Sequence, residues 1–236
     1  MIVCFIQSRL GSSRLPNKAL LPLLWGKDEE QPLITHVISR CRDIAEKVPI
    51  FCLIPYGQIE IYEDATVYHK INYLMGDERN VYSRFVSALD LIEDTYGKKI
   101  QTCIRITGDC PLICPDIIDR VLQHHKKNAK MGVFYTSNDT DRSAYPDGQD
   151  VEIFEVDAFR KYLPMNYEER EHVTIALKRS SVCGLVMSDL LWPKEKLSVD
   201  TEEDYQTVKT IFDSLGGDVP RTAKELCSAL WKIKYV

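Results

Sequence analysis

The sequence predicts an α/β fold with a doubly wound, mainly parallel sheet. Short apolar runs alternate with amphipathic segments along most of the 236 residues, and this alternation is typical of such a sheet. The 44% hydrophobic content excludes a disordered chain, and only 11 glycines and 11 prolines exclude a collagen-like one. No internal repeat or long linker divides the sequence, so we expect a single domain over residues 1–236.

The apolar runs define the expected strands, the first of which starts at the second residue. In order, the strands cover residues 2–7, 50–54, 103–107, 132–135, 151–154 and 182–187. The amphipathic segments define the expected helices. In order, the helices cover residues 32–47, 81–96, 115–127, 168–179, 202–215 and 222–232. The second helix has the clearest pattern, because its apolar residues recur at helical spacing behind Asn80, an N-cap residue type. This alternation places helices on both faces of the sheet.

Charge and cysteine usage exclude several classes of protein. The formal net charge of −5 argues against a surface that coats nucleic acid. No apolar run approaches the roughly 20 residues that span a bilayer, and residues 1–7 lack the charged start of a signal peptide. The eight cysteines contain no CxxC pair, and several lie in apolar runs, as reduced thiols do in cytosolic proteins. We therefore expect a cytoplasmic protein with no nucleic-acid, membrane or zinc partner.

The loop after the first strand has the composition of a phosphate-binding site. Ligands collect at the carboxyl ends of parallel strands, so these loops are where chemistry is expected. The loop combines cations, hydroxyls and a glycine: Arg9, Gly11, Ser12, Ser13, Arg14 and Lys18. No carboxylate precedes Asp28, and successive amides beside the two serines can form an anion-binding nest. Neither GxxxxGK[ST] nor GxGxxG is present, and the alternative is a polar surface loop with solvated cations.

Two aspartates follow expected strands and are candidate magnesium ligands. Asp109 comes directly after the 103–107 strand, and Asp200 follows a short apolar segment. Mg²⁺ on a nucleoside triphosphate takes one or two protein carboxylates together with phosphate oxygens and water. Each aspartate also has a structural alternative. Asp109 fits a turn before Cys-Pro, and Asp200 fits an N-cap whose capping box is completed by Glu203.

Polar residues in the second half of the chain are candidates for binding an acceptor. Residues 137–148 are the most loop-like segment. The side chains that could orient an acceptor there are Arg142, Tyr145, Asp150 and Glu152. The last two alternate along a strand and should share one face, although a polar hairpin rim explains them equally well. Further along, Arg170 is expected to bind an anion, and His172 to contact substrate without acting as a catalyst.

Five segments, spread in order over nearly the whole chain, carry motifs of one known family. They are Ile6–Lys18 (IQSRLGSSRLPNK), Arg105–Pro115 (RITGDCPLICP), Tyr145–Phe154 (YPDGQDVEIF), Arg170–Thr174 (REHVT) and Val199–Asp204 (VDTEED). Together they resemble the cytidylyltransferase family that includes CMP-KDO and CMP-sialic acid synthetases, in particular its spore coat polysaccharide biosynthesis protein F branch.

The chain departs from the pattern of that branch in four places. Ser8 stands where the family usually has alanine, and Asn17 where it usually has glycine. Residues 27–31 look like a small insertion. Residues 55–60 lack the usual Thr/Asn/Asp-rich turn that shapes the base pocket, so the resemblance implies a preference for cytosine less firmly than it implies triphosphate binding.

The resemblance implies a nucleotidyltransferase fold of glycosyltransferase-A type, with CTP as co-substrate and Mg²⁺ as cofactor. The leader loop would bind CTP through Arg9, Ser12, Ser13, Arg14 and Lys18. Asp109 and Asp200 would hold magnesium and, with Arg14 and Lys18, form the catalytic group. An oxygen of a small anionic acceptor then attacks the α-phosphorus and pyrophosphate leaves. Sugar acids, phosphorylated sugars or alcohols, and phosphonates are the acceptor classes, and surface polysaccharide or glycan biosynthesis is the expected role.

Several alternatives stay open at this point. Arg84, at the start of the 81–96 helix, either faces the nucleotide or forms a surface salt bridge. A homodimer is implied through the polar region around residues 137–165. Asp139-Thr-Asp141 matches the DxD pattern of metal-dependent glycosyltransferases that use nucleotide sugars. The remaining alternative is a non-catalytic nucleotide-binding domain.

Overall fold

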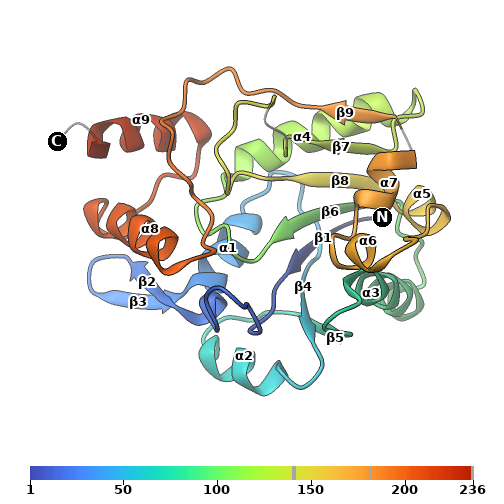
Figure 1. Ribbon diagram of the computed structural model, residues 1–236, viewed down its shortest axis with the longest axis horizontal. Helices are drawn as coiled ribbons and strands as arrows, with labels where there is room; N and C mark the ends of the chain where they lie inside the picture. Colours follow the sequence, from blue (N-terminus) through green and yellow to red (C-terminus); the bar gives the residue numbers. More distant parts are fainter. Residues whose placement is uncertain (140–141, 181, 235–236) are drawn as a thin grey trace.

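A seven-stranded sheet forms the centre of the computed structural model, which describes residues 1–139, 142–180 and 182–234 (Figure 1). Its strand order is β5-β4-β1-β6-β8-β7-β9. The strands are β1 (Ile2–Gln7), β4 (Ile50–Pro55), β5 (Tyr73–Gly76), β6 (Thr102–Thr107), β7 (Tyr135–Ser137), β8 (Glu152–Glu155) and β9 (Cys183–Leu185). Neighbouring strands pair in parallel except β8, which runs antiparallel to β6 and β7. The mainly parallel α/β class is therefore confirmed.

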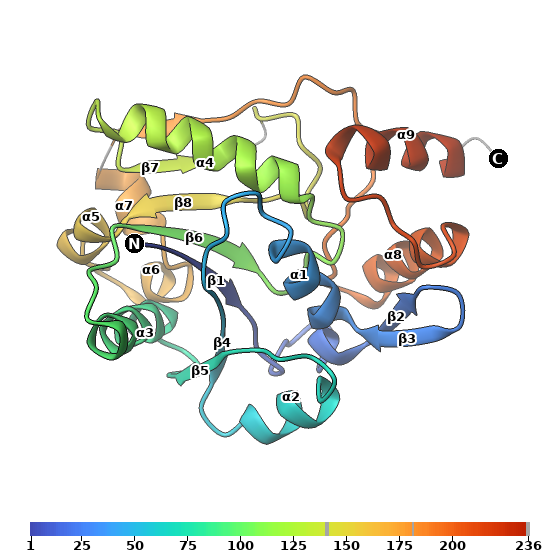
Figure 2. The same cartoon turned by 180° about the vertical axis from the view of Figure 1, so that it is seen from behind.

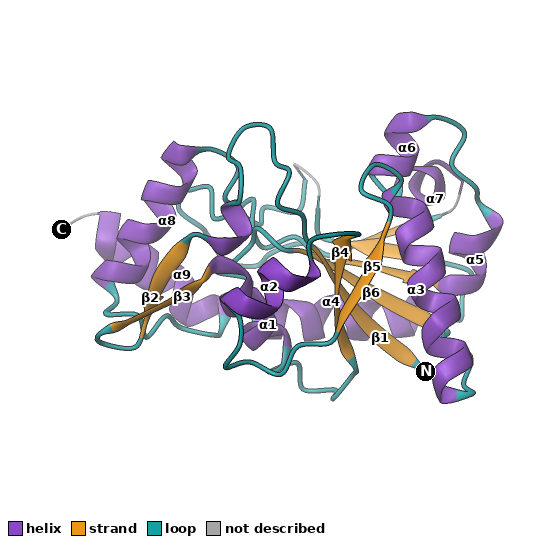
Figure 3. Ribbon diagram, turned by 90° about the horizontal axis from the view of Figure 1, so that it is seen from below, coloured by secondary structure: helices purple, strands orange, loops and turns teal. Residues whose placement is uncertain are grey.

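Helices cover both faces of this sheet, as predicted. They are η1 (Lys18–Leu20), α1 (Leu33–Cys41), α2 (Ile59–Ala65), α3 (Val81–Tyr96), α4 (Pro115–Ala129), α5 (Val156–Lys161), α6 (Tyr167–Glu171), α7 (Ile175–Ser180), α8 (Glu202–Ser214) and α9 (Ala223–Lys234). Helices α1 and α4 cross one face, with α8 and α9 beside them (Figure 2). Helices α3, α5 and α7 cover the other face, and Figure 3 shows this group from below. None of the helices in the described ranges is long and apolar enough to span a bilayer.

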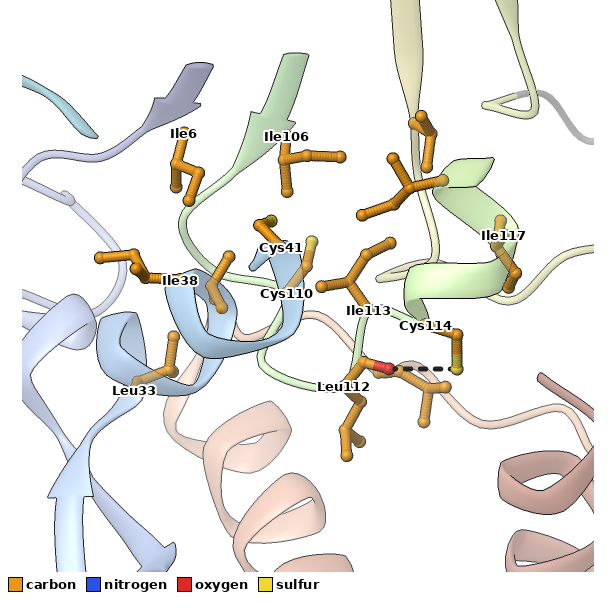
Figure 4. Close-up of a cluster of buried hydrophobic side chains, with 14 of the residues drawn as sticks. Ile6, Leu33, Ile38, Cys41, Ile106, Cys110, Leu112, Ile113, Cys114 and Ile117 are labelled. Carbon is orange, nitrogen blue, oxygen red and sulfur yellow. Dashed lines mark hydrogen bonds between the residues drawn. The ribbon is translucent and has the colours of Figure 1, made fainter. Parts of the chain in front are cut away.

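Alternation along β1 divides the buried side chains into two cores. Cys4 and Ile6 belong to the core shared with α1 and α4, whereas Val3 and Phe5 belong to the core under α3. Figure 4 shows the first core, where Ile6 and Ile106 face side chains of α1 and the start of α4. Seven of the eight cysteines are buried, most of them in these cores, as the apolar runs predicted.

The order of the strands locates the ligand-binding edge. From β1 the chain moves outward through β4 to β5 and then returns, through α3, to β6 on the opposite side of β1. The strand order thus reverses between β1 and β6. Their carboxyl ends are level, because Gln7 pairs with Thr107 in the register. In open α/β sheets ligands bind in the crevice at such a switch point.

Several expected elements are shifted or shortened, and each change has a local cause. Helix α1 ends at Cys41 rather than at residue 47, because the amide of Ala45 is tied to the Asp119 carboxylate of α4 at 3.0 Å. The strand expected at 132–135 forms at 135–137, because Gly132 (φ +84°) still belongs to the turn after α4. The helix expected at 168–179 is two helices, α6 and α7, divided at Val173 (φ +35°).

The sequence did not predict the short elements. These are η1, the strands β2 (Pro22–Trp25) and β3 (Glu29–Pro32), α2, β5 and α5. Strands β2 and β3 form a separate hairpin, and the suspected insertion at 27–31 covers part of its turn and most of β3. This hairpin packs on α8, where the Tyr205 hydroxyl donates to the Pro22 carbonyl at 2.7 Å. The insertion itself contacts α8, where Lys209 donates to Glu30 at 3.3 Å, and it lies outside the main sheet.

Candidate active site

A cavity of about 210 Å³ opens at the carboxyl ends of β1 and β6, where the strand order reverses. Hereafter it is the cationic cavity, because five cationic side chains and three carboxylates line it. They are Arg9, Arg14, Lys18, Arg84 and Arg105, with Asp109, Glu171 and Asp200. Ser12, Ser13 and His172 also line it. The surplus of cations on an acidic protein gives this cavity the charge that a polyphosphate requires.

Lys18 joins the two candidate magnesium ligands. Its ammonium donates to Asp109 Oδ2 at 2.7 Å, to Asp200 Oδ1 at 2.9 Å and to the Val199 carbonyl at 2.7 Å. Burial alone would lower the pKa of Lys18, but the two aspartates outweigh it and raise that pKa, so the ammonium stays charged. Two carboxylates from distant parts of the sequence therefore converge on one point.

The glycine before Asp109 fixes the position of that aspartate. Any other residue at this place would force neighbouring atoms to move. Gly108 donates its amide to the Gln7 carbonyl at 2.8 Å, which draws the turn after β6 against the end of β1. A Cβ on Gly108 would lie 2.8 Å from the Cβ of Ser8 and 3.0 Å from that same carbonyl. The turn itself agrees with the structural alternative for Asp109, but its carboxylate is directed at Lys18.

Asp200 is not the helix cap that the alternative interpretation proposed. Thr201 is the N-cap of α8, and its capping box is completed by Asp204 rather than by Glu203. The Asp200 carboxylate instead accepts from Arg14 at 2.9 Å, from Lys18 and from Lys196 at 2.8 Å. Burial would raise the pKa of Asp200, but the hydrogen bonds from the two lysines prevail and lower it to about 2. This carboxylate is ionised at any physiological pH.

The residues present fit a divalent cation. Asp109 and Asp200 direct one oxygen each at the ammonium of Lys18, so the point where they meet already holds positive charge. The backbone fixes this pairing, because the Val199 amide donates to the Asp109 carbonyl at 2.9 Å. Two carboxylates are the number that a Mg²⁺ ion on a nucleoside triphosphate takes from protein.

Only some of the other residues of the leader loop lie where they were predicted. Arg9 pairs with Glu171 at 3.2 Å, and this ion pair connects the leader loop to α6. Ser12 lines the cationic cavity, but its amide donates to the Leu10 carbonyl at 2.9 Å and is not part of an open nest. Gly11 does not line that cavity. A Cβ there would meet the carboxylate of Glu78.

Arg84 touches the cationic cavity, yet its charge is directed into the protein. The residue is 1% exposed, so the surface salt bridge is wrong. Its guanidinium donates to the carbonyls of Asp77 at 2.7 Å and Glu78 at 3.1 Å, with longer contacts to those of Ser8 and Leu53. Arg84 therefore holds together the ends of β1, β4 and β5 beside the cavity.

A second cavity of about 460 Å³ adjoins the first and shares Arg105, Thr107 and His172 with it. We call it the adjoining cavity. The remaining lining residues are mostly acidic or hydroxylic: Asp139, Asp150, Glu152, Glu168, Thr174, Ile175 and Lys178. Asp150 and Glu152 thus both line this cavity, although only Glu152 belongs to strand β8.

Glu152 is buried at the centre of a network in the adjoining cavity. It forms ion pairs with Arg105 and with Lys178, the latter at 2.8 Å. It also accepts from the hydroxyls of Tyr135 at 2.5 Å and Thr174 at 2.6 Å. A carboxylate with four donors is fully satisfied, so Glu152 orients its neighbours and its oxygens are occupied.

Three expected acceptor residues lie outside both cavities. Arg142 is exposed and lines a separate hollow beside β9. Tyr145 packs against the core beneath α4. Arg170 is exposed on α6. The first residue of the DxD pattern, Asp139, pairs with Lys178 at 3.3 Å, and residues 140–141 lie outside the described ranges.

Sequence reasoning missed several residues of the two cavities. Arg105 begins the motif RITGDCPLICP, but the sequence predicted only that it lies in a strand. Lys196, which lines neither cavity, lies in a loop four residues before Asp200 and binds both that residue and Asp204, the latter at 2.9 Å. Glu171 and Lys178 bracket the break at Val173, which turns both toward the cavities. A lysine four residues before the aspartate was the only local signal.

The comparison with known protein families decides the family of the chain. The sequence model of the cytidylyltransferase family matches residues 3–181. The chain belongs to the cytidylyltransferase family. It is accordingly a nucleotidyltransferase enzyme, and the resemblance inferred from the five motifs is confirmed. Asp200 lies beyond the matched range, in the C-terminal segment that carries the last motif.

Three relatives of this cytidylyltransferase cover nearly all of its length. The spore coat polysaccharide biosynthesis protein SpsF of Bacillus subtilis is 25% identical over 97% of this chain and 93% of its own. A cytidylyltransferase structure from Leptospira borgpetersenii superimposes with a TM-score of 0.82 at 23% identity, covering 99% of this chain and 94% of that one. A CMP:2-keto-3-deoxy-manno-octonic acid synthetase complexed with CTP gives 0.62 at 17% identity, covering 91% and 99%. The two structures share the fold.

Proposed function

We propose that this enzyme transfers CMP from CTP to a small acceptor in a Mg²⁺-dependent reaction, in the synthesis of a surface polysaccharide or glycan. One observation carries the proposal: Asp109 and Asp200 converge on one cationic point beside the leader loop. The name of the Bacillus relative supports the polysaccharide role, and the structure complexed with CTP supports the co-substrate. The homodimer and the single domain stay part of the proposal.

The residues of the cationic cavity divide the work of binding the triphosphate. Arg14 is 62% exposed at the mouth and is free to swing from Asp200 to a phosphate. Lys18 is largely shielded, with its side chain 12% exposed, and can exchange its carboxylate partners for phosphate oxygens at the same position. Asp109 and Asp200 would hold Mg²⁺, which neutralises charge on the departing pyrophosphate when bound. No protein nucleophile is required, because the acceptor oxygen attacks the α-phosphorus directly.

The adjoining cavity is the proposed acceptor site. An anionic handle, as in a sugar acid, phosphate ester or phosphonate, would meet Arg105 and Lys178, with His172 at the border between the two cavities. Arg142 and Arg170, which were expected to serve this purpose, would have to move to reach it. Binding of an anionic acceptor therefore depends on Arg105 and Lys178, whose charges Glu152 already partly neutralises.

A nucleotide panel tests the proposed function. The enzyme is incubated with CTP, UTP, ATP or GTP, with Mg²⁺ or EDTA, and with a pooled acceptor library, and pyrophosphate release and product mass are measured. We expect release with CTP and Mg²⁺ only. Release of UDP or CMP from a sugar nucleotide instead would support the glycosyltransferase alternative. Nucleotide binding without turnover would support the non-catalytic one.

A further inference from the structure

We propose that Asp150 is the catalytic base that removes the proton from a hydroxyl group of the acceptor. The inference rests on the proposed function and deepens it, because it selects the acceptor by the chemistry of its attacking oxygen. Asp150 lies in the wall of the adjoining cavity, and Arg105, Thr107 and His172 join that cavity to the one that holds the triphosphate. A molecule bound there has the Asp150 carboxylate on one side and the phosphate-binding residues on the other.

Asp150 is held rigidly between the two loops that carry Asp109 and Asp200. On one side, the Leu197 amide donates to the Asp147 carbonyl at 2.7 Å. Gly148 adopts φ +99° there, and a Cβ on it would overlap the backbone of Leu197. On the other side, the side chain of Gln149 is bonded to the Leu112 carbonyl at 2.7 Å and to the Cys114 amide at 2.9 Å. A base that must meet a reacting proton benefits from such fixation.

The hydrogen-bond inventory leaves Asp150 able to accept a proton. Among the described residues, the Gly148 amide donates to its Oδ2 at 2.9 Å. Arg105 and Lys178, which line the same cavity, are both paired with Glu152. No ion pair of Asp150 occurs within the described ranges, in contrast to Asp109 and Asp200. The other oxygen of its carboxylate is therefore available to the contents of the cavity.

The surroundings of Asp150 favour proton transfer near neutral pH. Burial raises the pKa of Asp150 to about 7, and the carboxylates of Asp139, Asp147 and Asp109 add to this effect against the hydrogen bond from Gly148. The other charged or titratable groups that line the same cavity are Arg105, Glu152, Glu168, His172 and Lys178. A general base works best when its pKa is close to the working pH.

The proposed step is balanced and identifies the acceptor class. The acceptor O–H proton passes to Asp150 as the acceptor oxygen forms a bond to the α-phosphorus of CTP. The bond from that phosphorus to the bridging oxygen breaks, and pyrophosphate leaves with the electron pair. A phosphate or phosphonate oxygen is already ionised at neutral pH and requires no base. The presence of a catalytic base in this site therefore indicates an acceptor that attacks through a hydroxyl group.

The test compares two acceptor sets in the full-length protein. One set holds hydroxy sugars and sugar acids, and the other holds phosphate monoesters and phosphonates. Wild type, Asp150→Asn, Asp150→Glu and the exposed control Asp157→Asn are assayed for CMP transfer from pH 5 to 9. Thermal melting and calorimetric CTP binding are measured on each. We expect transfer to a hydroxyl acceptor, a loss of about 100-fold or more in kcat with Asp150→Asn, and unchanged CTP affinity.

A second variant separates a base from a structural residue. Asp147→Asn removes one of the carboxylates that raise the pKa of Asp150, so we expect it to shift the acidic limb of the pH–kcat profile to lower pH. Transfer to phosphate monoesters alone, or an Asp150→Asn enzyme with the wild-type pH profile, would overturn the role of Asp150 and leave the proposed function intact. Wild type that binds CTP but transfers CMP to neither set would reject the proposed function itself.

Discussion

At the scale of single residues, the geometry of the site depends on a few charged side chains and on the oppositely charged groups that they contact. Asp200 illustrates this: three cations surround it, and the N-cap role that its sequence position suggests belongs to Thr201. The sequence placed Lys18, Asp109 and Asp200 in loops after strands, which was enough to expect them at one edge. The partners of Arg84 and Arg105 could not be predicted, because they lie on other strands and depend on the register of the sheet.

The two aspartates are expected to be essential for turnover. Asp109→Asn or Asp200→Asn should lower Mg²⁺-dependent pyrophosphate release by about 100-fold or more, because one ligand of the cation loses its charge. The measurement is the rate of release per folded molecule. Thr201→Ala is the matched control: it should cost about 1 kcal/mol of stability and retain turnover. A destabilised Asp200→Asn with normal specific activity would return the residue to a capping role.

Arg14 is expected to contribute to binding more than to stability. Because its side chain is largely exposed, Arg14→Ala should leave the melting temperature nearly unchanged. Loss of a charge-assisted contact to phosphate should raise the Kd of CTP about 10-fold, as measured by calorimetry. Arg142→Ala is the control, since Arg142 is exposed and lies outside the cationic cavity. Equal effects of the two variants would argue against a specific role for Arg14.

Asp150 is expected to make stability depend on pH in a defined direction. Its pKa is raised in the folded protein to about 7, against about 3.9 in an unfolded chain. Below pH 4 both states hold the proton, and the folded state loses stability as pH rises from 4 to 7. Asp150→Asn should therefore melt several degrees above wild type at pH 8 but close to it at pH 4. A difference that is constant with pH would contradict the raised pKa.

At the scale of elements, the long segments were predictable and the short ones were not. Helix α3 was predicted with the bounds that it has, because its apolar stripe and its Asn80 cap are both local signals. Helices α2 and α5 and strand β5 are only a few residues long and are stabilised by contacts that a single sequence does not show. The break at Val173 was invisible for the same reason, since nothing in REHVT marks a residue at positive φ.

Arg84 is expected to be the strongest link between α3 and the sheet. Arg84→Met should lower the free energy of unfolding by about 3 kcal/mol, because the carbonyls of Asp77 and Glu78 lose the charged donor that the buried Arg84 supplies. Urea denaturation followed by circular dichroism measures the loss. Arg79→Met, on the exposed turn before α3, is the control and should change stability by less than about 0.5 kcal/mol. Similar losses for both variants would show that the burial of Arg84 is unimportant.

At the scale of the whole molecule, the segment that joins α5 to α6 and the first residue of α6 present apolar side chains to solvent. Leu163, Met165 and Tyr167 are 61%, 76% and 57% exposed. We expect a homodimer through this region, with light scattering giving the mass of two chains. Met165→Asp should weaken association and give the mass of one chain at low concentration. A wild-type monomer at all concentrations would reject this prediction.

The pairing of Asp109 with Asp200 also has a consequence for when the protein becomes active. The Val199 amide binds the Asp109 carbonyl, so the two acidic side chains meet only after the chain has passed residue 200. During translation, strands β1, β4 and β6 are synthesised well before residue 200. Under the proposed function, a nascent chain that stops before Asp200 would hold only one of the two proposed ligands of the ion and would not turn over CTP.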